Sequence, residues 1–287
     1  MESSDHEHHA VPAGRGLAWF QHAMRAFERS PRGLVQVASL YVLLVFAQQM
    51  LAGVPGIPAV LVLSLSLFGP ALTAGVMHAV DLAQSGRPVA ASDLFEGLRR
   101  PGVRTQLLVL GLFATVNAAI AVMAFRRVLG PEGLKVLELL AKHAIKPDSA
   151  QAQALALPLL KAAMAASAVF LFVWAGLFFS VPRVMFDGRN ALLSIYDSIV
   201  AVLANALPMI AYVLLWCGAG FVFLIASSLV LALLSLLGPL GEMLYLLLLF
   251  ATMVALVVVA ATGNFLAFRE VFLRSGEAPP PQAGIIV

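Results

Sequence analysis

Six stretches of the chain are almost continuously apolar over about twenty residues or more. They cover residues 33–53, 57–80, 105–125, 162–181, 207–235 and 240–268. A helix needs about 20 apolar residues to cross a hydrocarbon core of roughly 30 Å. In a bilayer every backbone N–H and C=O must be paired within the protein, and these runs lack the period-two alternation of barrel strands. The pattern predicts an all-α polytopic membrane protein with about six transmembrane helices in one domain, residues 33–268.

Turn sequences separate these predicted spans. The VPGIP run at residues 54–58 follows the first span, and Gly238-Pro239 separates the fifth from the sixth. Pro70 lies inside the second span, where it removes a helical hydrogen bond and is expected to kink the helix. Residues 1–14 are polar and predict a disordered tail, and residues 269–287 are expected to form a cytoplasmic tail.

An amphipathic segment precedes the first span. Apolar residues recur there at spacings of three and four, and arginines cover most of the opposite side. The pattern predicts a helix over residues 15–32 that lies in the headgroup region, with its arginines toward anionic phosphates. The expected interfacial anchors are Trp19, Phe20, Phe27, Arg25 and Arg29.

Two further segments are amphipathic. Residues 191–205 carry a polar stripe opposite an apolar face, made of Ser194, Asp197, Ser198 and Asn205. In residues 132–146, a leucine-rich face lies opposite the charged side chains of Lys135, Glu138, Lys142 and Lys146. Both segments predict interfacial helices. Anchoring is the simpler interpretation of all three amphipathic helices, and regulated lipid sensing is the alternative.

Composition supports the membrane interpretation and excludes other classes. Hydrophobic residues make up 61% of the chain and charged residues only 11%, whereas a soluble domain has about a quarter charged residues. The net charge of +3 comes from scattered residues without a long basic run, which argues against nucleic-acid binding. The expected partner is the bilayer, with its anionic headgroups. The single cysteine, Cys217, lies in an apolar run and is interpreted as a small apolar filler.

The distribution of Lys and Arg predicts the orientation. With a cytoplasmic N-terminus and six spans, twelve of the 18 Lys and Arg residues lie on the inner side and six on the outer side. Cytoplasmic loops carry the excess of these residues. The count favours two cytoplasmic termini in an inner membrane. The 126–161 connection opposes this orientation, because all six outer residues lie there.

Few residues within the spans have ionisable or strongly hydrogen-bonding side chains. No catalytic, cofactor-binding or metal-binding set is predicted. The chain contains no P-loop, HExxH, G-x-S-x-G or Rossmann glycine pattern. His78 and Asp81 share a helix face near the end of the second span, where a local hydrogen bond is the simpler interpretation and proton handling the alternative. Asn117, Asn264 and Thr73 are candidate polar contacts in the bundle. They are expected to link helices or, alternatively, to contact a substrate.

The N-terminal region is similar to a known family. The strings GRGLAWFQHAMRAFERSP, GPALTAGVMHAV and SDLFEGLRRPG together resemble uncharacterised bacterial inner-membrane proteins of the BPSS-type family. The similarity covers roughly the first 110 residues, and the VPRVMFDGRNALLSIYDSIVAVLANALP segment resembles the family more loosely. The resemblance implies about six spans and a bacterial inner membrane. It implies no biochemical activity and no catalytic residues.

Three functions are open at this stage. The first is a non-enzymatic membrane scaffold or a component of envelope maintenance. The second is a transporter or permease for a small molecule or a lipid, without ion-coupling charges in the membrane. It is motivated by the predicted kink and by a short repeat, YVLL, at residues 41–44 and 212–215. The third, an intramembrane enzyme, is disfavoured because no acid, base and nucleophile set is present.

Overall fold

A computed structural model describes residues 8–25, 31–52, 66–146 and 148–272. Throughout these residues the secondary structure is helical, with short turns between the helices and no strand. Five helical segments are long and apolar enough to cross a membrane. They are Pro31–Leu51, Pro101–Ala141, Ala150–Asp187, Ala206–Leu237 and Pro239–Val271. The protein is therefore an all-α polytopic membrane protein, as the apolar runs predict.

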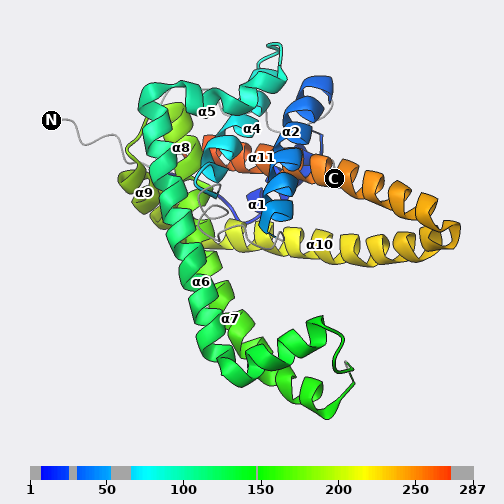
Figure 1. The fold of residues 1–287 in the computed structure, drawn as a ribbon. Coiled ribbons are helices and arrows are strands. Elements are labelled where there is room, and N and C mark those ends of the chain that lie inside the picture. Colours follow the sequence, from blue (N-terminus) through cyan, green and yellow to red (C-terminus); the bar gives the residue numbers. More distant parts are fainter. Residues whose placement is uncertain (1–7, 26–30, 53–65, 147, 273–287) are drawn as a thin grey trace.

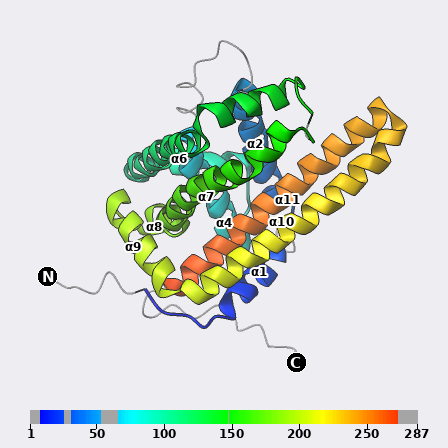
Figure 2. The ribbon, with the colours of Figure 1, turned by 90° about the horizontal axis from the view of Figure 1, so that it is seen from below.

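Two helical hairpins project from a common core in different directions (Figures 1 and 2). The first, the α6–α7 arm, consists of α6 (Pro101–Ala141) and α7 (Ala150–Phe178). The second, the α10–α11 arm, consists of α10 (Ala206–Leu234), the short helix η3 (Ser235–Leu237) and α11 (Pro239–Val271). Their outer surfaces expose large apolar side chains, among them Met123, Leu160, Phe221 and Leu246. Such surfaces suit contact with hydrocarbon.

The core lies where the two arms meet. It contains α1 (Arg15–Met24), α2 (Pro31–Ala52), α4 (Gly69–Gln84), η2 (Ala91–Phe95), α5 (Glu96–Arg99), α8 (Ser180–Asp187) and α9 (Ala191–Ala204). One continuous cluster of buried residues runs through it, and its largest fully buried members include Trp19, Phe179, Met77 and Leu94. We call α1, α8, α9 and the ends of α10 and α11 that meet them the core junction.

The predicted second span differs from the helix that the structure contains. α4 begins at Gly69, so Pro70 lies in the first turn of a helix, where proline is tolerated. Ten of its 16 residues are buried inside the protein. α4 packs against α2, and Gly33 at the start of α2 lies against Val89, which follows α4. The segment that follows α4 therefore lies beside the residues with which α2 begins. Residues 57–65 of the predicted span lie outside the described residues.

The N-terminal segment and the end of α11 lie side by side. The His9 backbone N–H donates to the Val271 carbonyl oxygen at 2.8 Å. Arg15 forms an ion pair with Glu270. Both segments therefore lie on the same face of any membrane that the protein spans.

Gly-Pro pairs mark a bend in one arm and a reversal in the other. Gly130 has φ 73° and ψ 169°, and Gly238 has φ 62° and ψ −141°. Residues with a side chain rarely adopt such a backbone conformation, which is nearly restricted to glycine. In each case the following proline begins a new helical segment. At Gly238 the chain reverses into α11, whereas at Gly130 α6 bends and continues to Ala141.

The predicted interfacial helix at residues 132–146 is the bent end of α6. It is helical to Ala141, and its leucines pack on the beginning of α7 around a small separate cluster of Leu129, Leu155 and Ala162. Its charged residues Lys135, Glu138 and Lys142 are exposed. The amphipathic pattern therefore serves a contact between helices at the tip of the arm.

The interfacial helix predicted at residues 191–205 corresponds to α9. A headgroup helix would turn its polar face outward and its apolar face toward the protein or lipid interior, but α9 turns its polar face toward the protein core. α9 buries Ser194, Ser198 and Asn205, each at most 1% exposed. Its apolar residues Leu192 and Leu203 are 70% and 69% exposed. Ser198 and Asn205 form hydrogen bonds with protein backbone, whereas the Ser194 hydroxyl is buried without a partner among the described residues. The apolar face points outward. An amphipathic period identifies the two faces but not their surroundings.

Candidate functional site

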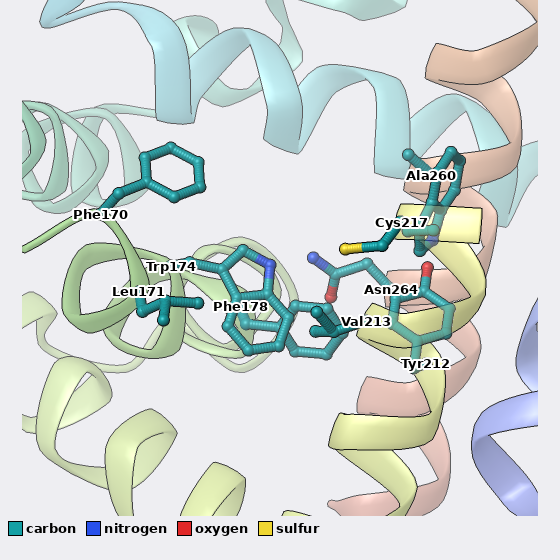
Figure 3. A pocket seen from close by; sticks show the side chains of 10 residues that line it. Phe170, Leu171, Trp174, Phe178, Tyr212, Val213, Cys217, Ala260 and Asn264 are labelled. Carbon is teal, nitrogen blue, oxygen red and sulfur yellow. The ribbon is translucent and has the colours of Figure 1, made fainter. Parts of the chain in front are cut away.

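A cavity of about 390 Å³ lies between α7, α10 and α11, close to the core (Figure 3). Three helices that are distant in sequence form its walls. The lining residues are Phe170, Leu171, Trp174 and Phe178 from α7, Tyr212, Val213, Trp216 and Cys217 from α10, and Ala260 and Asn264 from α11. The walls are therefore mainly aromatic and aliphatic, with few polar atoms.

Aromatic rings pack against one another along the wall. The ring centroids of Trp174 and Phe178 are 4.9 Å apart, and those of Phe178 and Tyr212 are 5.9 Å apart. Tyr212 in turn contacts Trp216 edge to face at 6.3 Å. Tilted and edge-to-face pairs of this kind are the favoured ring arrangements. Because Tyr212 also contacts buried Trp19 at 6.2 Å, the wall is continuous with the core.

The cavity opens on the outer surface of the arms. Phe170 and Leu171 at its edge are 66% and 53% exposed, and Cys217 is exposed as well. Other large apolar residues of α7 and α10 are exposed as well, among them Phe172 and Leu214. These helices are candidate membrane spans, so the opening lies on apolar helix surfaces of the kind that suit contact with hydrocarbon.

Asn264 is the strongest hydrogen-bonding group among the lining residues. Its amide points from α11 toward the aromatic residues of α7 (Figure 3). Its Oδ1 atom is buried and makes no hydrogen bond to the described residues. A buried amide group normally has a partner, because an unpaired one costs about 1–3 kcal/mol. The unpaired amide therefore indicates a position where a ligand group can bind.

The structure does not gather the other predicted bundle residues around this cavity. Asn117 donates to the carbonyl oxygen of Phe113 on its own helix at 2.8 Å. Thr73 and His78 are half-buried on α4. Asp81 pairs with Arg87 at 3.0 Å instead of forming the local hydrogen bond expected with His78. Asn264 is thus the one predicted polar contact that lines the cavity.

The predicted interfacial anchors differ in their surroundings: some are buried in the protein and others are exposed. Trp19 is 1% exposed, packs inside the protein and donates from Nε1 to Glu270 Oε2 at 2.7 Å. Phe20 is half-buried against Trp216, and Arg25 is exposed. Phe27 and Arg29 lie outside the described residues. Leu17 and Met24 are exposed on α1, so α1 packs on the protein with one side and presents an apolar stripe with another.

Close packing requires a glycine on the buried side of α1. A Cβ atom added to Gly16 would lie 2.2 Å from the Pro208 carbonyl oxygen at the start of α10. Asn205, three residues before Pro208, accepts a hydrogen bond from Val11 N–H at 2.8 Å and donates to the His9 carbonyl at 3.2 Å. These contacts fix the segment before α1 and α1 itself onto the α10–α11 arm.

Sequence reasoning missed a buried charge cluster beside α9. Arg183, which is 8% exposed, pairs with Asp187 at 3.0 Å and Asp197 at 3.1 Å. Arg189 also pairs with Asp197, and the Arg183 guanidinium lies 4.6 Å from the Phe272 ring centroid. The spacing of acidic and basic residues between positions 183 and 197 was the available signal.

Ser198 was placed in the polar stripe, but its role was not foreseen. Its Oγ accepts from the Phe179 N–H at 2.9 Å and donates to the Ala175 carbonyl at 2.6 Å. In an uninterrupted helix that N–H would bond that carbonyl directly. The hydroxyl therefore occupies the break between α7 and α8, one of the known causes of helix kinks.

Comparisons with protein-family models, with curated proteins and with solved structures return no match to this chain. The class that the fold and the cavity define is an all-α polytopic membrane protein with an aromatic cavity open to the surface of its spanning helices.

Proposed function

We propose that this protein is a non-enzymatic membrane protein that binds a lipid acyl chain in the cavity between α7, α10 and α11. The single observation that carries the proposal is an aromatic cavity whose edge belongs to candidate membrane spans. Its volume of about 390 Å³ lies within the range of roughly 300–1,000 Å³ that ligand sites occupy. In the membrane, the ligand that reaches this opening most readily is lipid.

The chemistry of the walls supports an apolar ligand over a water-soluble one. Ten residues line the cavity, and none is Asp, Glu, Lys, Arg or His. A polar solute would lose its hydration without finding compensating charges or hydrogen bonds. The same composition supports binding without catalysis, since no acid–base pair faces the cavity.

This proposal favours lipid handling over the scaffold hypothesis. A scaffold requires a surface for a protein partner, whereas the cavity supplies a specific place for a small apolar molecule. Membership in the BPSS-type family remains a hypothesis based on the N-terminal resemblance, and it contributes no activity to the argument.

We further propose that both termini are cytoplasmic, in a bacterial inner membrane. The contact between His9 and Val271 supports a common face for the two described ends. The distribution of Lys and Arg supports the cytoplasm as that face. Exposed arginines such as Arg25, Arg99 and Arg104 suit anionic lipid headgroups, and no nucleic-acid partner is proposed.

The test uses tryptophan fluorescence, because two of the three tryptophans line the cavity. Purified protein in detergent is titrated with phosphatidylglycerol that carries brominated acyl chains, which quench nearby tryptophans. We expect saturable quenching in the wild type. In Ala260→Leu, a larger side chain enters the cavity, and we expect clearly weaker binding.

The matched control is Ala251→Leu, which makes the same change at an exposed position of α11 that does not line the cavity. This variant should bind like the wild type. Quenching that does not saturate, or that is equal in both variants, would show that lipid contacts only the outer surface and would overturn the proposal.

A further inference from the structure

The unpaired amide of Asn264 identifies a chemical feature of the ligand. Its Oδ1 is buried without a partner, and no described residue forms a hydrogen bond with its Nδ2. Asn264 lines the cavity, its amide nitrogen is directed toward the aromatic wall (Figure 3), and Nδ2 is not among the buried atoms without a partner. An amide nitrogen is a donor. The group that satisfies it must be an acceptor, held close to an otherwise apolar chain.

The depth of Asn264 narrows the choice of acceptor. It lies seven residues before Val271, the end of α11, which is about 10 Å along a helix axis. α11 has 33 residues and is about 50 Å long, while the hydrocarbon core is about 30 Å thick. A helix centred in the bilayer then extends about 10 Å beyond the hydrocarbon at each end. Asn264 therefore lies near the hydrocarbon boundary.

The polar residues at the end of α11 agree with this depth. Arg269 and Glu270 follow Asn264 by less than two turns, and Glu270 is paired with Arg15 and Trp19. Toward the arm tip, no charged residue occurs in α11 until Glu242 in its first turn. The hydrocarbon boundary on this side thus falls between Asn264 and Arg269. In a glycerolipid, the ester carbonyls lie at this level and the acyl chains below it.

From this arrangement we infer that the ligand is a diacyl glycerolipid, with one acyl chain along the aromatic wall and an ester carbonyl accepting a hydrogen bond from Asn264 Nδ2. The inference rests on the proposed function, since it specifies the lipid that the same cavity binds. Trp174 and Phe178 contact the upper part of the chain, and Phe170 and Leu171 lie where the chain leaves the cavity. The ester carbonyl oxygen accepts from Nδ2, whereas Oδ1 of the same amide is itself an acceptor and takes no part in this contact.

The experiment compares two lipids that differ only in the presence of the two ester carbonyls. Unlabelled diester phosphatidylglycerol and the diether phosphatidylglycerol of the same chain length compete with the brominated lipid for the wild-type protein. The diether lacks the carbonyl oxygen but keeps the headgroup and the chains. We expect the diester to compete about tenfold better, the effect of one satisfied hydrogen bond.

Two variants connect that preference to one residue. In Asn264→Leu the diester and the diether should compete equally, because the donor is absent. Asn117→Leu makes the same substitution at an amide that bonds its own helix outside the cavity, and it should keep the preference. The wild-type comparison needs no variant, so it remains decisive if Asn264→Leu does not fold.

Each result has a separate meaning. Equal competition by both lipids in the wild type, with saturable binding, would overturn the ester contact and leave the acyl-chain site intact. A preference that persists in Asn264→Leu would also overturn it. Absence of saturable binding by either lipid would remove the proposed function itself.

Discussion

The core junction and the α10–α11 arm are built from the same kind of helix but are held together differently. In the junction, polar side chains link segments that are distant in sequence, as Glu270 does with Trp19 and Asn205 with Val11. Along the arm, apolar packing dominates, and the Ser227–Tyr245 hydrogen bond of 2.8 Å links α10 to α11. Within the described residues, these polar links between distant segments thus occur where helices must meet in one geometry.

This difference has a physical reason. Lipid chains are as apolar as leucine, so burial of apolar surface does little to favour one arrangement of spanning helices over another. A buried hydrogen bond or ion pair is satisfied in only a few geometries, and it is costly to break. We therefore expect substitutions in the junction to destabilise the protein much more than chemically matched substitutions in the arms.

Trp19→Ala should produce the largest effect. It removes a fully buried ring and the hydrogen bond to Glu270, so the free energy of unfolding should fall by about 3–5 kcal/mol. Thermal unfolding in mild detergent measures the change. Phe221→Ala, at a position 65% exposed on α10, is the control and should unfold close to the wild-type temperature. Equal losses in the two variants would contradict the distinction between junction and arm.

Asp197→Ala should be the next most damaging. It leaves Arg183 with Asp187 as its remaining acidic partner in a buried site, so we expect a loss of about 3 kcal/mol in unfolding free energy. Glu138→Gln breaks the exposed Glu138–Lys142 pair at the arm tip and should change nothing measurable. Chemical unfolding in detergent compares them. A stable Asp197→Ala protein would show that the cluster does not hold α8 against α9.

Ser198→Ala should have an intermediate effect. The substitution leaves the Phe179 N–H and the Ala175 carbonyl without the hydroxyl that joins them, at a cost of about 1–3 kcal/mol. Ser228→Ala removes a hydroxyl that bonds its own helix on the exposed side of α10 and is the matched control. If both serines prove equally dispensable, the break between α7 and α8 does not depend on Ser198.

Ser227→Ala should have the smallest effect of the series. The Ser227–Tyr245 hydrogen bond joins two helices in an apolar setting, where such bonds contribute about 0.6 kcal/mol on average. A double-mutant cycle with Tyr245→Phe measures the coupling between the two side chains. A coupling larger than the Ser198→Ala loss would reverse the expected order and place the specifying contacts in the arm.

The candidate site shows how far the sequence alone can lead. Asn264 was recognisable as a polar residue within a span, and it lines the cavity. Asn117 had the same appearance in the sequence, yet it bonds its own helix. The aromatic residues of α7 and α10 that complete the cavity could not be selected in advance. Membership in a common wall depends on how three helices cross, and hydropathy contains no information about crossing.

The apolar runs by themselves determined that this protein is a helical membrane protein, because their length matches the bilayer and a backbone in lipid must pair internally. The amphipathic patterns also indicated helices near residues 15–32 and 191–205, since apolar residues that recur with a period of about 3.6 are typical of a helix. Only the tertiary structure decided what each helix face contacts. It buried Trp19 and Ser198 and paired Arg183 with Asp197, because hydrogen-bond partners for those groups arise only when separate segments meet.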